Sequence, residues 1–190
     1  AEAFRLAHGW MNDRNSIAPD TVVPILTSAA RHGDRAFFDD LVAQALQSHS
    51  QRDRYSIAAA LAAFDDSALV RAGLDLLLSG KLDARELTAM LQPRKETQAI
   101  LWDFVKENFD RLNTKLPGAR GIPFGATLPL TARGFCDEKD RADVERFFST
   151  RIADLSGGAR NLNTALESIR LCEARKSALA AGLVAFLARY

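Results

Sequence analysis

Apolar residues recur every three to four positions along almost the whole chain, and this period is what most limits the fold. One stripe comprises Phe37, Phe38, Leu41, Val42, Ala45 and Leu46, and another comprises Val144, Phe147, Phe148, Ile152 and Leu155. Such spacing puts apolar side chains on one face of an α-helix, whereas a half-buried strand would alternate them with polar ones. No segment shows a convincing alternation. The sequence therefore predicts an all-α fold.

Start and stop signals divide this pattern into separate helices. Asp20, Asp34, Asp66 and Asp140 each precede a helical run, where a short acidic side chain accepts hydrogen bonds from the free amide groups. Breaks fall at glycine- and proline-containing turns: Ser79-Gly80, Gln92-Pro93, Leu116-Pro117-Gly118 and Ser156-Gly157-Gly158. We expect about ten or eleven helices joined by short turns.

Three helix openings resemble one another, because an Asp-x-Ala sequence begins at Asp34, Asp66 and Asp140. Their spacing is not constant, which suits a degenerate stack of helix pairs, as in HEAT or armadillo arrays, better than a closed bundle. We therefore expect residues 1–190 to form a single α-helical repeat domain. Such an array buries its stripes between neighbours and leaves a concave face.

The net charge, the length of the apolar runs and the cysteine spacing limit the classes of partner and of site that we expect. The formal net charge is +1 with no long basic run, which disfavours nucleic acid or an anionic membrane as the main partner. No apolar run reaches the roughly 18 residues that a membrane span needs. Cys136 and Cys172 lie far apart, and Cys172 falls on an apolar stripe, so we expect Cys172 to be a buried thiol.

The chain carries no recognisable catalytic or metal motif. His8, His32 and His49 belong to no HExxH sequence and have no partner at metal-ligand spacing. Asp39 and Asp40 are not followed by the further carboxylate that an aspartate-rich magnesium site needs. The glycine-rich segment GARGIPFG, residues 118–125, lacks the lysine and hydroxyl residue of a phosphate-binding loop. We expect no catalytic site of its own.

Three segments, taken in order, carry a family resemblance: LWDFVKENFDRL at 101–112, DVERFF at 143–148 and NTALESIR at 163–170. The residues that match are Trp102, Phe104, Val105, Asn108, Phe109, Leu112, Phe147, Phe148, Leu166, Glu167, Ile169 and Arg170. Together these segments resemble helices in the C-terminal domain of gluzincin zinc aminopeptidases, such as aminopeptidase N and the puromycin-sensitive enzyme. The weaker helical pattern extends the resemblance over almost the whole chain.

The resemblance implies a right-handed superhelix of HEAT-like helix pairs that packs over the catalytic domain of its own polypeptide. In the family this domain bounds an internal cavity, and peptide substrate can reach its concave face. Zinc and the catalytic glutamate belong to preceding domains, so the resemblance implies no cofactor in this chain and zinc in the parent enzyme. The alternative is a free-standing helical-repeat scaffold that binds a protein or peptide partner.

Three expectations remain. Arg94, Lys95 and Arg120 are candidates for contacting peptide carboxylates, although solvated helix ends are the simpler interpretation. LWDFVKENFDRL places Trp102 and Phe109 on one helical stripe, which predicts a packed seam and not a ligand pocket. A domain taken from a larger enzyme should also expose an unusually apolar face and tend to self-associate.

Overall fold

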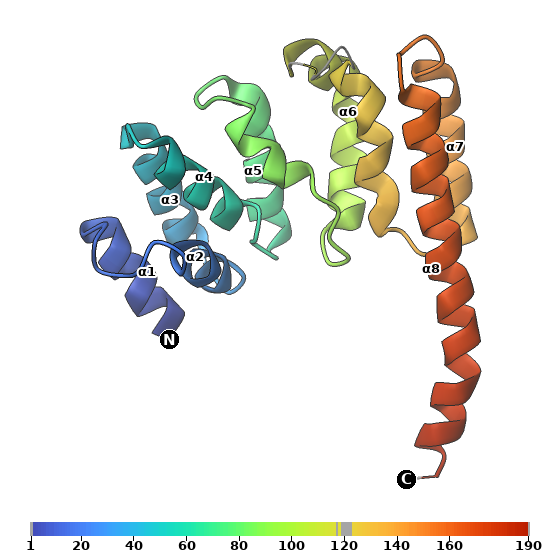
Figure 1. Cartoon of the computed structure of the whole chain (residues 1–190), viewed down its shortest axis with the longest axis horizontal. Helices are drawn as coiled ribbons and strands as arrows, with labels where there is room; N and C mark the ends of the chain where they lie inside the picture. Colours follow the sequence, from blue (N-terminus) through green and yellow to red (C-terminus); the bar gives the residue numbers. More distant parts are fainter. Residues whose placement is uncertain (1, 117, 119–122, 190) are drawn as a thin grey trace. The chain divides into compact units, whose positions relative to one another are not determined.

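The computed structural model describes residues 2–116, 118 and 123–189. Within these ranges every regular element is helical and no strand occurs, which confirms the all-α prediction. The elements are α1 (Glu2–Asn12), α2 (Val22–Ala30), α3 (Arg35–Gln47), α4 (Gln51–Leu61), α5 (Ser67–Ser79), the 3-10 segment η1 (Glu86–Leu91), α6 (Gln98–Lys115), the 3-10 segment η2 (Phe124–Gly134), α7 (Glu138–Arg151) and α8 (Gly158–Leu187) (Figure 1). They pack as two compact units, unit 1 (Ala1–Gln92) and unit 2 (Pro93–Tyr190).

Unit 1 is built around α4, which packs against α2, α3 and η1. The second half of α4 is rich in alanine, and the fully buried Ala60 lies beside the fully buried Ile57. Small side chains allow neighbouring helices to approach closely, so one short helix can pack against several others. Phe64, just after α4, is also fully buried and packs edge-to-face against Phe38 of α3.

Side-chain caps begin several of the helices. Asp34 accepts a hydrogen bond from the amide of Phe37, and Asp66 accepts from two amides of the first turn of α5, as expected. The prediction for Asp20 and Asp140 was wrong. The residue before α2 makes no capping bond, and Asp140 lies inside the first turn of α7, where Asp137 is the cap.

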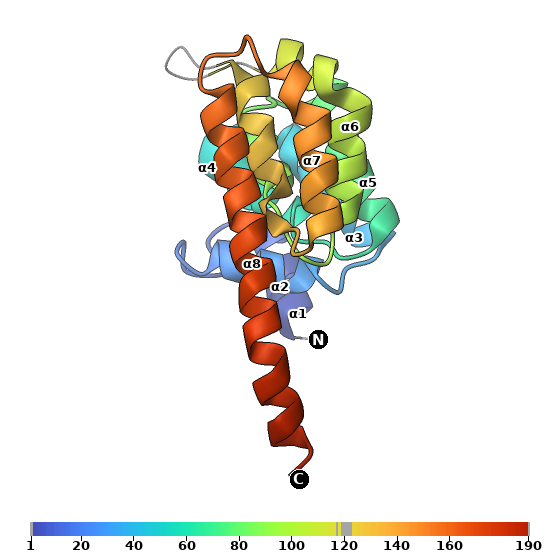
Figure 2. The same ribbon diagram turned by 90° about the vertical axis from the view of Figure 1, so that its right-hand side faces the viewer.

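In unit 2, α8 packs against η2 and α7, and α6 packs against η2 (Figure 2). The contact between α6 and η2 requires a glycine. Gln98 at the start of α6 is buried, and its amide nitrogen donates to the carbonyl of Thr131 at 2.9 Å. A Cβ atom at Gly134 would lie 2.1 Å from the Gln98 carbonyl oxygen, so no other residue fits at Gly134 without moving Gln98.

The two cysteines correct the expectation of a buried thiol. Cys136, in the loop before α7, and Cys172 on α8 form a disulfide with a Cα–Cα distance of 5.1 Å. Cys172 is exposed. Ile169 is the last α8 residue recorded as buried, so Cys172 lies just beyond the part of the helix that unit 2 covers. The disulfide ties α8 to the unit close to its last supported turn.

The C-terminal part of α8 projects past the other helices of unit 2 in both views (Figures 1 and 2). In its first half Leu162, Ala165 and Ile169 are buried. In its second half Leu179 and Leu183 are more than half exposed. The predicted helix is therefore present, but Leu179 and Leu183 of its last apolar stripe are largely open to solvent.

Candidate functional site

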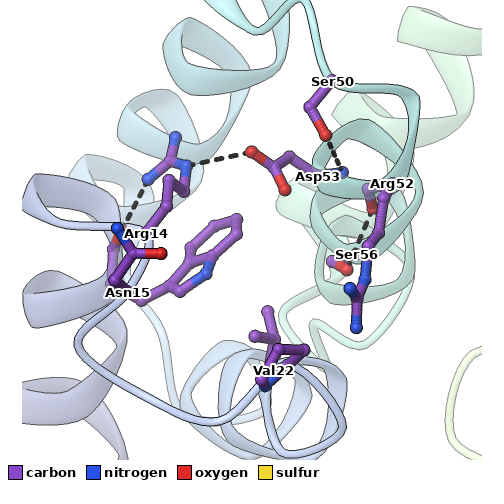
Figure 3. Close-up of a pocket in the computed structure, with 9 residues that line it drawn as sticks. Arg14, Asn15, Val22, Ser50, Arg52, Asp53 and Ser56 are labelled. Atoms are coloured by element: carbon purple, nitrogen blue, oxygen red, sulfur yellow. Dashed lines mark hydrogen bonds and ion pairs between the residues drawn. The ribbon is translucent and has the colours of Figure 1, made fainter.

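A hollow of about 260 Å³ opens in unit 1 beside α1, the loop that follows it, α2 and the start of α4 (Figure 3). Its lining residues are Trp10, Arg14, Asn15, Pro19, Val22, Ser50, Arg52, Asp53 and Ser56. Trp10 supplies an apolar wall and is almost completely buried. The hollow is smaller and more polar than a typical pocket for a small molecule, so it suits one polar or charged group.

Arg14 holds one side of this hollow in place. Its Nε donates to Asp53 of α4 at 3.2 Å, and its Nη1 donates to the carbonyls of Trp10 and Met11 at the end of α1. Its other Nη donates to Gln44 of α3. The guanidinium also lies 4.0 Å from the centre of the Trp10 ring. Arg14 thus joins three helices and covers the indole face of Trp10. Because its charge is already paired, we regard Arg14 as a structural residue.

Arg52 differs from Arg14, although both line the hollow. Its side chain is exposed, and its guanidinium forms no ion pair within the part of the chain that the structure describes. Figure 3 shows it on the α4 side, away from the Arg14–Asp53 pair. Arg52 is thus the cation at this hollow that remains able to bind an anionic group, and a planar guanidinium suits a carboxylate.

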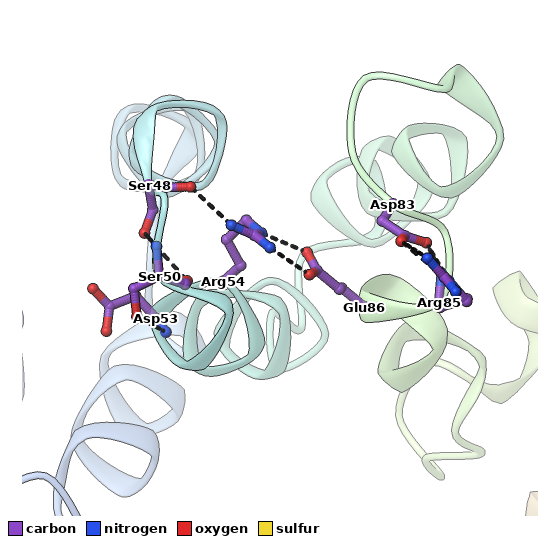
Figure 4. A network of polar contacts seen from close by, with 7 residues as sticks. All are labelled: Ser48, Ser50, Asp53, Arg54, Asp83, Arg85 and Glu86. Atoms are coloured by element: carbon purple, nitrogen blue, oxygen red, sulfur yellow. Dashed lines mark hydrogen bonds and ion pairs between the residues drawn. The ribbon is translucent and has the colours of Figure 1, made fainter.

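A second polar network joins α4 to η1 (Figure 4). Arg54 binds both carboxylate oxygens of Glu86 at 2.8 Å and donates to the carbonyl of Ser48 at 3.0 Å. The hydrogen bond to Glu86 raises the pKa of Arg54 above its ordinary value. The Glu86 side chain is only 6% exposed, so its charge requires this paired partner. The network is a structural clamp between two layers of unit 1.

Another depression in unit 1, of about 370 Å³, lies between α3 and α5. Its charged groups largely neutralise one another. Arg35 pairs with Asp39 at 2.9 Å, and Asp75 pairs with a neighbouring arginine at 3.4 Å. No single charge dominates this depression, so it favours no class of ligand.

The structure separates the residues that the sequence suggested for peptide contact. Lys95 is exposed, whereas Arg94 is half-buried and already has an interaction partner. Arg120 lies outside the described residues. None of these three residues lines the hollow. Sequence reasoning did not single out Arg14, Arg52 or Asp53, because residues 39 positions apart pair here without a local motif.

The motif residues of α6 and α7 form a packed aromatic seam, as the helical stripe predicted. Trp102 is 4% exposed and lies edge-to-face against Phe135 and Phe147, with ring centres 6.2 and 5.3 Å away. Phe109 contacts Phe147 and Phe148 in similar geometry. Phe104 is completely buried. The seam fills the space between these helices with packed aromatic rings.

The polar motif residues form hydrogen bonds and ion pairs within their own helices. Asn108 donates to the carbonyl of Phe104, one turn earlier in α6, and accepts from Arg111. The backbone of Asn108 departs from helical geometry, with φ −120° and ψ 16°, so α6 is kinked at this residue. Glu167 is exposed and pairs with Arg170 on the surface of α8.

Two properties of the described residues bear on cofactors and membranes. No group of three or more histidine, cysteine, aspartate or glutamate side chains in the described ranges is arranged to hold a metal ion. Among the same residues, no helix combines the length and the apolar character needed to cross a bilayer.

Comparison with known proteins places this fold in a family. Residues 1–171 match the family described as ERAP1-like C-terminal domain. Over 177 residues the chain is 25% identical to aminopeptidase M1-C of Oryza sativa subsp. japonica, covering 88% of this chain and 19% of that protein. It is 22% identical to the mitochondrial aminopeptidase 2 of Saccharomyces cerevisiae and 24% identical to aminopeptidase 2 of Candida albicans, covering 88% and 83% of this chain and 18% and 17% of those proteins. The chain thus spans less than a fifth of the length of each relative. With a family match over most of its length, this chain belongs to the ERAP1-like C-terminal domain family.

Proposed function

We propose that this chain is the non-catalytic C-terminal domain of a zinc aminopeptidase, where it packs over the catalytic domain and bounds the cavity that peptide substrates enter. The observation that carries this proposal is the family match over residues 1–171, together with relatives that are aminopeptidases about five times as long. The described residues offer no metal site, so catalysis in such a protein would belong to another domain.

The mass of the native polypeptide is the first test. An antibody raised against the purified chain should detect, in cells that express the native gene, a species several times larger than 20.8 kDa. The purified chain should bind no stoichiometric zinc and should not hydrolyse an aminoacyl amide. A native species of 20.8 kDa would contradict the proposal and would favour the alternative, a free-standing scaffold.

Within this proposal, the hollow of unit 1 is the best candidate for contact with peptide. Its volume of about 260 Å³ suits one or two residues of a peptide and not a whole chain. The exposed, unpaired Arg52 offers a partner for a carboxylate. Lys95 remains a second candidate, because it is exposed on unit 2.

Charge reversal at Arg52 tests peptide contact in the full-length enzyme. Arg52→Glu should raise KM for peptides several-fold and leave the hydrolysis of a single aminoacyl amide unchanged, because the small substrate does not reach this domain. Arg31→Glu is the matched control, since Arg31 is equally an exposed arginine of unit 1 but does not line the hollow. Equal effects of both variants, or of Arg52→Glu on both substrates, would remove the hollow from the proposal.

A further inference from the structure

The disulfide between Cys136 and Cys172 lies at the border between the covered and the uncovered part of α8. Ile169 is buried, and no described residue of α8 beyond it is buried. Cys172 is exposed, whereas Cys136 is half-buried in the loop before α7. Exposed disulfides are the ones that thiols open most readily, and they include the labile and regulatory ones. Of the two cysteines, Cys172 is the one that an external thiol can approach from solvent.

Two cations lie one helical turn from Cys172. Arg175 and Lys176 follow it by three and four residues, the spacing at which side chains are neighbours on the surface of a helix. Both side chains are exposed, and neither forms an ion pair within the described residues. The adjacent Glu173 lies about 100° around the helix from Cys172, so it opposes these two charges only in part.

This arrangement favours an anionic thiol as the reagent. Guanidinium and ammonium groups attract the carboxylates of an incoming thiol, which raises its concentration beside Cys172. Neighbouring cations also lower the pKa of a cysteine thiol, so a released Cys172 sulfur is stabilised as a thiolate. Cys136 differs, because Asp137 and Glu138 follow it directly and would repel an anionic thiol. Exposure and charge therefore select the same sulfur.

We propose that Cys172 is a site of thiol–disulfide exchange with an anionic low-molecular-weight thiol of the glutathione class. The thiolate of this reagent attacks the Cys172 sulfur, the bond to Cys136 breaks, and the Cys136 sulfur leaves as a thiolate that takes a proton from water. The reagent is then joined to Cys172 as a mixed disulfide. A second thiolate attacks the reagent's sulfur and releases Cys172. Both protein sulfurs are thus reduced, while two reagent thiols are oxidised to one disulfide.

The exchange is coupled to the aromatic seam through the loop before α7. Phe135 precedes Cys136, is only 9% exposed, and has its ring centre 6.2 Å from that of Trp102. The closed disulfide holds this loop against α8. Opening removes the covalent tie and leaves Phe135 held by packing and its backbone hydrogen bond, so Trp102 becomes more accessible to solvent. Unit 1 contains neither cysteine and should not respond.

Reaction of the folded, oxidised chain with reduced glutathione tests the proposal. Peptide mapping after acid quenching should find the mixed disulfide on Cys172, and the rate should rise in proportion to the glutathione concentration. The double substitution Arg175→Gln and Lys176→Gln should slow the reaction about five-fold at low salt, and this difference should vanish near about 1 M salt. Cysteamine, whose ammonium cancels the charge of its thiolate, should react equally fast with the parent chain and the double variant.

Arg160→Gln is the matched control, because Arg160 is an exposed arginine of α8 about three turns before Cys172 and forms no ion pair within the described residues. It should react like the parent chain. A rate that saturates with glutathione at the rate of unfolding would overturn the proposal, as would a mixed disulfide on Cys136 or equal slowing by Arg160→Gln. In Trp10→Phe, acrylamide should quench Trp102 more strongly after opening, and unchanged quenching would overturn the coupling to the seam.

Discussion

Replacement of Trp102 by phenylalanine separates the two ways in which this side chain stabilises unit 2. The indole ring packs edge-to-face against Phe135 and Phe147, and its Nε1 donates to a carboxylate oxygen of Asp143 on α7 at 2.9 Å. Phenylalanine keeps an aromatic ring in the seam and removes the donor. The tilted ring of Phe148, 5.6 Å away, would also lose part of its contact.

The loss of unfolding free energy in Trp102→Phe depends on how deeply Trp102 is buried and on how exposed its acceptor, Asp143, is. A hydrogen bond to a charged group contributes about 1.5–3 kcal/mol. The Asp143 side chain is 40% exposed, so water can replace the lost donor, and we expect a loss below this range, about 1 kcal/mol. Loss of the second indole ring from a site that is 4% exposed adds about 1 kcal/mol. Trp102→Phe should thus lower the free energy of unfolding by about 2 kcal/mol, and Trp102→Ala by about 3–5 kcal/mol.

Urea unfolding can assign this loss to unit 2, because the chain has only two tryptophans and Trp10 lies in unit 1. In Trp102→Phe the remaining fluorescence reports unit 1 alone, and far-UV circular dichroism reports both units. Trp10→Phe is the control, since the Trp10 indole nitrogen makes no hydrogen bond within the described ranges. A double-mutant cycle with Asp143→Ala should give a coupling of about 1 kcal/mol. An unchanged unit 2 transition, or no coupling, would refute the role assigned to the seam.

Three further measurements test other contacts. Glu86→Ala should destabilise unit 1 by about 2–3 kcal/mol, because it leaves the partly buried Arg54 without its bidentate partner. Urea unfolding followed by Trp10 fluorescence measures this loss, and a loss under about 0.5 kcal/mol would contradict the prediction. Breaking the Cys136–Cys172 disulfide, which spans 36 residues, by double serine substitution should destabilise unit 2 by about 3–4 kcal/mol through the entropy of the unfolded chain, and a reducing agent should then have no further effect. The Arg85 side chain and backbone amide hold the pKa of Asp83 at about 2, so the ionised carboxylate stabilises the fold above pH 4. Asp83→Asn should remove less than about 1 kcal/mol above pH 4 and almost nothing well below pH 2, as pH-dependent melting will show.

The sequence was sufficient to predict features that depend only on neighbouring residues, such as helix caps. The caps at Asp34 and Asp66 were predictable because each depends only on the next three residues. Asp140 shows the limit of this reasoning, since a second aspartate three residues earlier can also cap. The chain enters α7 from η2 in a conformation that makes Asp137 the cap, and that entry angle is a tertiary property.

The candidate site could not be predicted in the same way. Arg14 and Asp53 meet across 39 residues, and Arg54 and Glu86 across 32, with no local pattern that marks either pair. Cys172 was misjudged for a related reason. An apolar stripe shows which face of a helix seeks a partner, but only the length of the neighbouring helices decides whether that partner reaches it.

The residues that carry the family resemblance are therefore not those in which function should be sought. Trp102 and Phe148 identify the chain because they fill a buried seam, and buried packing restricts residue type more than solvent exposure does. Their substitution changes stability first and reports little on recognition. The surface that we propose for peptide contact is the hollow beside Arg52, where an exposed side chain can change without disturbing the fold. Charge reversal at Arg52 thus tests peptide contact without removing a core side chain, because Arg52 is exposed.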